Sequence, residues 1–223
     1  MNAVVTYIFG TNMEILREPL VVEPGVEYIC VTDNSKLKSK FWKIIYDNIP
    51  QAACARDKMV YVKYNPFKYT KARYICVIDG SIEISSMLSP FFAKLGKVDM
   101  LVKHHPQRDN LEDELHIWNT RRNLPDMCIY KFMAMSDVDG ISLTNKFLIE
   151  SCVLGYNTNL KSRFLCTLML QYMAWLGNNG RLCITNQCAL SYLLQKYPIS
   201  IDYINQDTFF NRYLHNSWTR NLL

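Results

Sequence analysis

Residues 63–84, KYNPFKYTKARYICVIDGSIEI, are the stretch that decides the predicted fold. The run Tyr74–Ile78 is continuously apolar and β-prone, as in strands that are buried on both faces of a parallel sheet. It leads into Asp79, and Gly80 and Ser81 then allow a tight turn and a close approach of the backbone to a ligand. Because open α/β sheets bind ligands at the carboxyl ends of their strands, Asp79 is a candidate for holding a metal ion or a sugar hydroxyl. An aspartate that only caps a turn is the competing interpretation.

Basic residues are concentrated just before this strand, with six Lys or Arg and one acid between positions 56 and 73. Cations beside a single acid suit a phosphate-bearing ligand with a divalent ion. Residues 50–63 have helical spacing, which puts Arg56 and Lys63 on one polar side of a helix, so that both could reach one ligand. A solvated helix face is the alternative explanation of that spacing.

The rest of the chain alternates between strand and helix patterns, as in an α/β fold. Residues 3–10 form a strand pattern that ends on glycine, and residues 27–32 form a second one that leads into Asp33. The Gly-x-Gly-x-x-Gly fingerprint of dinucleotide-binding folds is absent from the sequence. Further strands are predicted at 41–46, 82–84, 98–103 and 125–135, and helices at 90–96, 107–122, 143–176 and 188–197, with a polar interruption at 155–159.

Length, charge and cysteine usage narrow the class of protein. A chain of 223 residues fits one α/β domain, and its net charge of +5 is concentrated before Asp79, which favours a phosphate ligand over a long nucleic acid. The eight cysteines form no Cys-x-x-Cys pair and lie mostly in apolar runs, so we expect reduced thiols and a cytoplasmic protein. The first apolar run is too short for a signal peptide or a membrane span.

Three motifs, in this order, carry a resemblance to a known family: YICVTDN at 28–34, IDGSI at 78–82 and HPQRDNLEDE at 105–114. The chain resembles the glycosyltransferases of GT-A fold that were long filed as a domain of unknown function, with members in plants, bacterial capsule loci and large algal viruses. The resemblance covers roughly residues 3–200. It implies an α/β fold of GT-A type, with a central, mostly parallel (mixed) sheet flanked by helices in one glycosyltransferase domain, 1–223. Residues 1–100 would form the nucleotide-sugar donor half, and residues 101–223 the acceptor half.

The resemblance also implies an activity, the metal-dependent transfer of a sugar from a nucleotide diphosphate, expected to be a UDP-sugar, to a glycan or glycoprotein acceptor. The expected ion is Mn²⁺ or Mg²⁺, held by the acid that opens an Asp-x-Asp motif in the family; here that acid is Asp79, and Ser81 replaces the second one. A late histidine, His215, would complete the ion's protein ligands. The residues expected at the donor are Thr6, Asp33, Arg56, Lys63, Asp79, Gly80 and Ser81, with Thr6 and Asp33 at the base and ribose.

On the acceptor side, His105, Arg108 and Glu114 match the family's His-Pro-x-Arg…Glu pattern. His104, Asn186 and Gln187 are expected beside them, where the family has Arg-Asp-Gln in place of Thr-Asn-Gln. An inverting transfer needs a base that deprotonates the acceptor, and His104, His105 and Glu114 are all candidates, whereas a retaining transfer needs none. The expected catalytic group is therefore Asp79 with His105 or Glu114.

Two other classes of protein fit parts of the sequence. A nucleotidyltransferase also places acids at strand ends, but GTNMEILRE at 10–18 is not the Gly-rich basic loop that such enzymes carry. A non-catalytic binding module could use the Lys- and Tyr-rich residues 61–74 as a stacking groove for single-stranded nucleic acid. Asp137-Val-Asp139 is formally an Asp-x-Asp motif. We interpret it as a polar turn with Gly140 and keep it as an alternative source of the acid predicted at Asp79. The favoured reading has no nucleic-acid partner and no membrane span.

Overall fold

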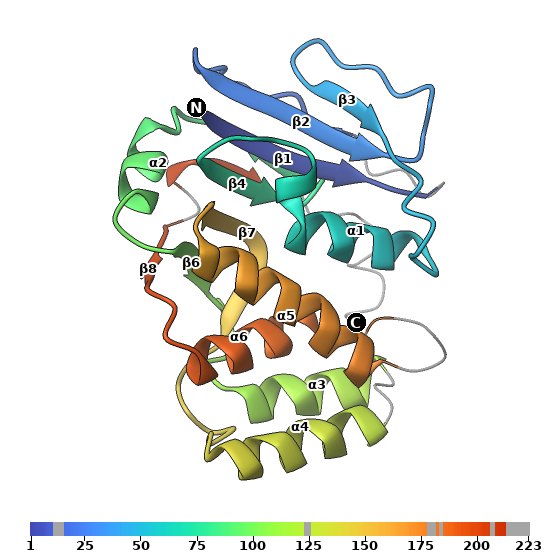
Figure 1. Ribbon diagram of the computed structural model, residues 1–223, viewed down its shortest axis with the longest axis vertical. Helices are drawn as coiled ribbons and strands as arrows, with labels where there is room; N and C mark the ends of the chain where they lie inside the picture. Colours follow the sequence, from blue (N-terminus) through green and yellow to red (C-terminus); the bar gives the residue numbers. More distant parts are fainter. Residues whose placement is uncertain (11–15, 123–125, 178–181, 183–184, 206–207, 213–223) are drawn as a thin grey trace.

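A seven-stranded mixed sheet forms the centre of the molecule, in the order β3-β2-β1-β4-β7-β6-β8 (Figure 1). The computed structural model describes residues 1–10, 16–122, 126–177, 182, 185–205 and 208–212. The strands of this sheet are β1 (Asn2–Ile8), β2 (Val26–Thr32), β3 (Lys43–Tyr46), β4 (Tyr74–Ile78), β6 (Met100–His104), β7 (Ile149–Asn157) and β8 (Ile201–Tyr203). The helices are α1 (Ala55–Tyr64), α2 (Ser89–Leu95), α3 (Leu111–Arg122), α4 (Asp126–Asp139), α5 (Leu160–Leu176) and α6 (Asn186–Lys196), with a 3₁₀ turn at Pro66–Lys68.

The direction of the strands is mostly parallel, and β7 is the exception. β1 pairs in parallel with β2 and β4, and β6 pairs in parallel with β8. β7 lies antiparallel between β4 and β6. The apolar run of β4 is buried from Ile75 to Ile78, as its sequence predicts for a strand covered on both faces.

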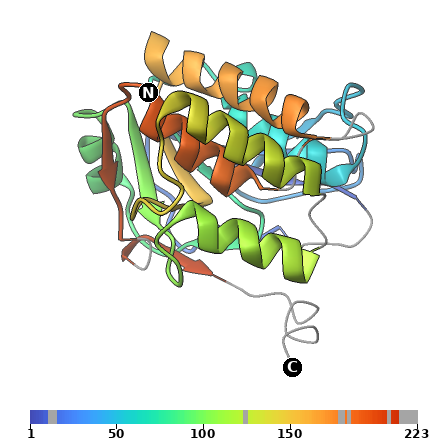
Figure 2. The same ribbon diagram turned by 90° about the horizontal axis from the view of Figure 1, so that it is seen from below.

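Two apolar cores lie on opposite faces of the sheet, because successive side chains of a strand point to opposite sides. Ala3, Val5 and Tyr7 face the core under α1, α3, α4, α5 and α6, whereas Val4 and Ile8 face the core under α2. The second face also carries a small antiparallel ladder of β5 (Ile82–Ile84) and β9 (Phe210–Arg212). Figure 2 shows α5 and β9 on opposite sides of the sheet. The ladder brings the end of the described chain back to the turn that follows Asp79.

The strand predicted at 125–135 is wrong, since this segment belongs to helix α4, which also includes the predicted turn residues Asp137 and Asp139. Its buried residues Cys128, Phe132 and Ser136 recur every fourth position, which is a helical spacing. Other large apolar side chains of the same segment, Met127, Tyr130 and Met133, are exposed. The run of apolar residues suggested a strand, although only some of these residues are buried and they recur at a helical spacing.

The helix predicted at 143–176 is also wrong in its first part, because residues 149–157 form the central strand β7. Eight of its nine residues are buried, so the run lacks the alternation that distinguishes a strand from a buried helix. Gly155 lies within the strand and not at a helix break. A Cβ atom there would stand 2.9 Å from Cβ of Leu101 and 3.0 Å from Cζ of Phe91, so glycine lets α2 and β6 approach β7 closely.

The described residues bear on two further expectations, reduced cysteines and the absence of a membrane span. Seven cysteines lie among them and none forms a disulfide. In the same part of the chain, no helix has both the length and the apolar composition that crossing a bilayer requires.

Candidate active site

Three of the predicted site residues lie at one edge of the sheet, because each follows a strand of the same direction. Asp33 follows β2, Asp79 follows β4 and His105 follows β6. β2 and β4 both pair in parallel with β1, and β4 and β6 both run antiparallel to β7. Their carboxyl ends therefore meet at the edge where α/β folds bind ligands.

Asp79 is held by contacts to one of its carboxylate oxygens. Its Oδ1 accepts a hydrogen bond from the hydroxyl of Tyr7 and lies 2.8 Å from Nζ of Lys63. Its backbone N–H donates to the carbonyl of Cys152 on β7 at 3.0 Å, which fixes the turn. The side chain is 33% exposed, so the carboxylate is anchored yet accessible to a ligand.

Lys63 differs from the sequence prediction of a cation on a polar helix face. The residue is only 5% exposed, and its ammonium group lies 5.9 Å from the ring centre of Tyr7. Burial of an ammonium group is costly unless a carboxylate or comparable partner is present, and Asp79 supplies it. Arg56, seven residues earlier on α1, is half-buried.

Asp33 forms a second ion pair at this edge. Its Oδ2 lies 2.9 Å from Nζ of Lys58, and its Oδ1 accepts the N–H of Gly10 at 3.2 Å. Burial raises the pKa of Asp33, but the bonds from Lys58 and Gly10 outweigh it and hold the pKa below its usual value. The carboxylate therefore stays charged, and the loops after β1 and β2 are tied together.

The structure does not bring Thr6 to this group. Thr6 is 1% exposed and lies on the opposite face of β1 from Tyr7. Its hydroxyl is buried without a hydrogen-bond partner among the described residues. Gly80 is buried and Ser81 is half-buried in the turn after β4, as the sequence predicts for residues beside Asp79.

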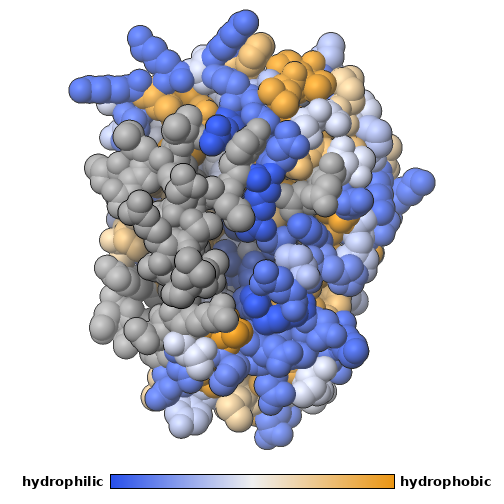
Figure 3. Space-filling model, turned by 180° about the vertical axis from the view of Figure 1, so that it is seen from behind, coloured by the Kyte–Doolittle hydropathy of each residue, from blue (hydrophilic) through white to orange (hydrophobic). Residues whose placement is uncertain are grey.

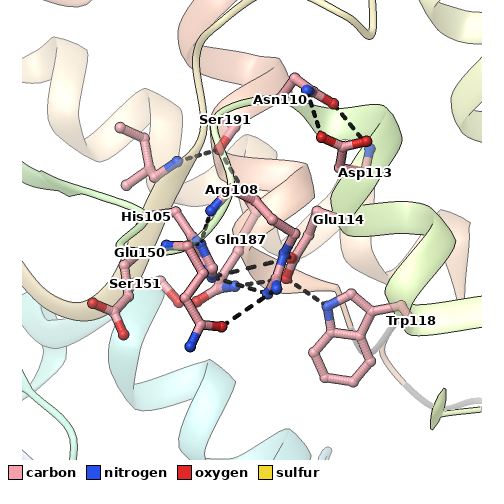
Figure 4. A network of polar contacts seen from close by, with 12 residues as sticks. His105, Arg108, Asn110, Asp113, Glu114, Trp118, Glu150, Ser151, Gln187 and Ser191 are labelled. Atoms are coloured by element: carbon pink, nitrogen blue, oxygen red, sulfur yellow. Dashed lines mark hydrogen bonds and ion pairs between the residues drawn. The ribbon is translucent and has the colours of Figure 1, made fainter.

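Glu114 is the centre of a polar network among the residues predicted for the acceptor side (Figure 4). It is 1% exposed, and its Oε1 accepts Nε1 of Trp118 at 2.8 Å and Nε2 of Gln187 at 2.9 Å. Its Oε2 accepts a hydrogen bond from Nε of Arg108. The predicted acceptor-side residues Arg108, Glu114 and Gln187 are thus brought together, but both oxygens of the carboxylate are already bonded.

His105 also has its ring nitrogens turned into the protein. Nδ1 accepts backbone N–H groups from Gln107 at 3.3 Å and Arg108 at 3.1 Å. Nε2 lies 3.2 Å from Nη2 of Arg108 and 4.0 Å from Oε2 of Glu114. Burial lowers the pKa of His105, and Arg108 adds to this effect while Glu114 opposes it. The imidazole is therefore held neutral.

A buried ion cluster that the sequence did not predict lies between Asp79 and His105. Glu150, the second residue of β7, is 4% exposed; its Oε2 lies 2.9 Å from Nζ of Lys103, and its Oε1 accepts a hydrogen bond from Arg212 of β9. Burial raises the pKa of Glu150, but the two cations bring it below the usual value. Burial lowers the pKa of Arg212, but the charge of Glu150 and, to a smaller extent, that of Asp79 raise it above its usual value. We call Lys103, Glu150 and Arg212 the Glu150 cluster.

The remaining predicted residues lie around these networks. The ring of His104 is exposed and stacks on Tyr203, with ring centres 3.7 Å apart. Asn186, at the start of α6, accepts the hydroxyl of Ser151 at 3.1 Å. His215 lies outside the described residues.

The described residues contain no group of three His, Cys, Asp or Glu side chains that could hold a metal ion by themselves. Asp137 and Asp139 lie on α4, at the lower end of the molecule in Figure 1, whereas β4 lies in its upper part. Asp139 binds Lys196 at 2.6 Å and accepts a hydrogen bond from Tyr192, so it has a structural role.

Comparison with known proteins adds the class of fold. The sequence matches no family profile and no curated protein. In structure, the chain has a GT-A-like glycosyltransferase fold.

Two solved structures carry that comparison. The chain is similar to mouse xyloside xylosyltransferase 1 in its apo form, with a TM-score of 0.53 and 9% identity over 100% of this chain and 91% of that one. It is also similar to the glycosyltransferase GlyE of Streptococcus pneumoniae TIGR4, with a TM-score of 0.52 and 9% identity. That alignment covers 92% of this chain and 45% of the GlyE chain.

Proposed function

We propose that this protein is a glycosyltransferase that moves a sugar from a UDP-sugar to a glycan or glycoprotein acceptor. The observation that carries the proposal is Asp79, accessible at the carboxyl end of β4 and paired with the buried Lys63, in a fold shared with two glycosyltransferases. Residues 1–100 form the donor half in this proposal, and residues 101–223 the acceptor half. The enzyme would act in the cytoplasm, because the seven cysteines of the described residues form no disulfide, which suits a reducing compartment.

The donor's base would lie beside Asp33. A carboxylate at a strand end can accept the imide hydrogen of uracil, and its ion pair with Lys58 keeps it charged. Arg56 and Lys63 would face the ribose and phosphates, since both lie on the side of α1 that reaches Asp79.

Departure of the nucleotide requires cations around the diphosphate. When the bond from the sugar's anomeric carbon to the diphosphate oxygen breaks, that oxygen gains negative charge, and fixed cations stabilise it. Lys63 and the Glu150 cluster supply cations on either side of Asp79. Glu150 would act as a positioning residue that holds Lys103 and Arg212 in place.

A divalent ion could bind at this site only if the phosphate groups of the donor supplied some of its ligands. The described contacts of Asp79 fall on Oδ1, so Oδ2 could bind Mn²⁺ or Mg²⁺ while phosphate oxygens and water complete the coordination. When bound, such an ion would neutralise charge on the diphosphate. His215 stays a proposed further ligand.

The acceptor would bind across Arg108, Gln187, Asn186 and His104. Glu114 is better suited to orient Arg108 and Gln187 than to take a proton, because both its oxygens are bonded. His105 directs its lone pair at the backbone. If the transfer inverts the anomeric carbon, His104 is the candidate base whose ring is exposed.

The proposal is tested by nucleotide-sugar hydrolysis or transfer in Asp79→Asn and Asp137→Asn, measured side by side. Asp79→Asn keeps the shape of the side chain and removes its charge, so the rate should fall at least about a hundredfold, which corresponds to about 2.7 kcal/mol. Asp137 is exposed on α4, and its substitution should leave the rate unchanged. Full activity of Asp79→Asn with loss in Asp137→Asn would remove the Asp79 site from the proposal.

A further inference from the structure

A run of lysines follows the candidate site residue Asp33 and has no part in the proposed reaction. Residues 34–46, NSKLKSKFWKIIY, contain four lysines and no acid. These lysines carry four of the five net positive charges of the chain. We call residues 34–43, which join β2 to β3, the lysine loop; its lysines are Lys36, Lys38, Lys40 and Lys43.

The lysines of this loop differ from the basic residues near Asp79 in their partners. Lys58, Lys63 and Lys68 each pair with an aspartate. Within the described chain, Lys36, Lys38 and Lys40 form no ion pair, and all three are exposed. Lys43 pairs with Glu27 at 3.4 Å, but its side chain is 63% exposed. Unpaired, exposed cations in one loop create a local positive field.

The backbone of the loop is fixed although its lysine side chains are exposed. Glu18 accepts the hydroxyl of Ser39 at 2.9 Å and the N–H of Lys40 at 3.1 Å. Trp42 is buried, and its Nε1 donates to the carbonyl of Arg17 at 2.8 Å. The cations are thus presented from a defined surface and not from a random coil.

One exposed apolar side chain belongs to the loop itself, and two more follow Glu18, the residue whose carboxylate holds the loop. Phe41 is 39% exposed, and Leu20 and Val22, which follow Glu18 in the chain, are 65% and 43% exposed. β3 is the edge strand of the sheet and lies at the top of Figure 1. Figure 3, seen from behind, shows hydrophilic side chains projecting next to hydrophobic surface along this upper edge.

We propose that the lysine loop docks the protein on an anionic phospholipid surface. Lysines near such a surface are attracted to its negative potential, and exposed Phe and Leu side chains gain by entering the interface between headgroups and acyl chains. A single-stranded nucleic acid would satisfy the lysines and could stack a base on Phe41, but it would give Leu20 and Val22 no apolar environment. Because the loop begins directly after Asp33, docking would bring the carboxyl edge of the sheet to the lipid surface.

Sedimentation of the full chain with vesicles tests this proposal without any nucleotide sugar. We expect binding to vesicles of phosphatidylcholine with phosphatidylserine, no binding to phosphatidylcholine alone, and loss of binding at high salt. Absence of binding to the anionic vesicles, or equal binding to both kinds, would overturn the proposal.

Matched variants locate the surface. Lys36→Gln, Lys38→Gln and Lys40→Gln together should lower the partition ratio by about a hundredfold, at about fivefold (about 1 kcal/mol) for each lysine. Lys97→Gln, Lys146→Gln and Lys161→Gln together remove the same charge from other exposed positions and should have little effect. Equal losses in the two triple variants would show a net-charge effect and contradict the docking loop.

Phe41→Ser tests the apolar part of the docking surface, because it keeps the charge of the loop. It should lower vesicle binding severalfold, and unchanged binding would contradict the lipid assignment. Binding to a single-stranded RNA that the loop variant abolishes, without binding to anionic vesicles, would assign the surface to nucleic acid instead. Thermal melts of each variant confirm that it is folded.

Discussion

Each carboxylate that the structure places at the carboxyl edge of the sheet already has a cationic partner. Asp33 pairs with Lys58, Asp79 with Lys63 and Glu114 with Arg108, and the Glu150 cluster holds two cations on one acid. Burying these charges singly would cost several kcal/mol each, and pairing offsets that cost. The pairs also hold the cations in fixed positions, so an arriving diphosphate would meet oriented ammonium and guanidinium groups without reorganisation of the site.

Glu114→Gln should destabilise the protein by about 2 kcal/mol. The substitution leaves Arg108 without its carboxylate, and the new NH2 group must face a donor, either Arg108 or Trp118 with Gln187. The free energy of unfolding in urea measures the effect. Glu112→Gln, on the exposed side of the same helix, is the control and should change stability by less than about 0.5 kcal/mol. A neutral Glu114→Gln would mean that the network contributes little to stability.

His105 predicts a specific pH dependence of stability. Its pKa is below the ordinary value of 6.5 in the folded state, so the unfolded chain takes up the proton first as the pH falls. The free energy of unfolding should therefore decrease as the pH falls below about 6.5, down to the folded pKa. Asp33 and Glu150, with lowered pKa values, add further losses only below their ordinary values of 3.8 and 4.5.

His105→Asn is the variant that isolates this effect, because its side-chain oxygen can replace Nδ1 as acceptor for the two backbone N–H groups. Between pH 7 and 5 its unfolding free energy should vary less than that of the unchanged protein. The same slope in both proteins would assign the pH dependence to another group.

At the scale of elements, the sequence predicted the strand ends on which the candidate site is built. A strand followed by an acid or a histidine is visible in a short window, which is why Asp33, Asp79 and His105 were placed correctly at strand ends. The Glu150 cluster was not found, because it depends on β7 and β9. β7 was predicted as helix, and Arg212 reaches Glu150 through a ladder between residues far apart in the chain. Burial of Lys63 likewise depends on the packing of α1 against β1 and α5, which helical spacing does not reveal.

β7 packs closely against its neighbours at Gly155. Gly155→Ala would place a methyl group 2.9 Å from Cβ of Leu101 and 3.0 Å from the ring of Phe91, so β6, β7 and α2 would have to separate. We expect a loss of about 1–3 kcal/mol in the free energy of unfolding. Gly96→Ala is the control, since its new methyl group meets the hydroxyl of Tyr74 at 3.3 Å and no closer atom. Equal stability of the two variants would contradict the close packing of β7.

At the scale of the whole molecule, the two halves of the proposed enzyme meet at β4 and β7. β4 supplies Asp79, and β7, paired with it in antiparallel register, carries Glu150 a few residues beyond the end of β4. The cations of α1 that are proposed to bind the donor, and those of β6 and β9, therefore converge on one edge although they come from three separate parts of the chain. Nucleotide binding should in consequence stabilise the fold as a whole and not one half of it.

Thermal unfolding with nucleotides measures that stabilisation. UDP at a hundred times its dissociation constant should add about 2.7 kcal/mol, a rise of roughly 5–10 °C in Tm for a chain of this size. GDP and CDP at the same concentration should give smaller shifts, because Asp33 can accept a hydrogen bond from the imide of uracil. Asp33→Ala should remove the preference for UDP. Each shift is measured relative to the Tm of the same variant without nucleotide. Asp47→Ala removes an acid that follows β3 and pairs with Lys68. It is the matched control and should keep the preference for UDP.

Leaving out manganese should reduce the shift if Asp79 and the diphosphate share an ion. Equal shifts for all three nucleotides would remove Asp33 from the base site, and equal shifts with manganese and with a chelator would remove the ion.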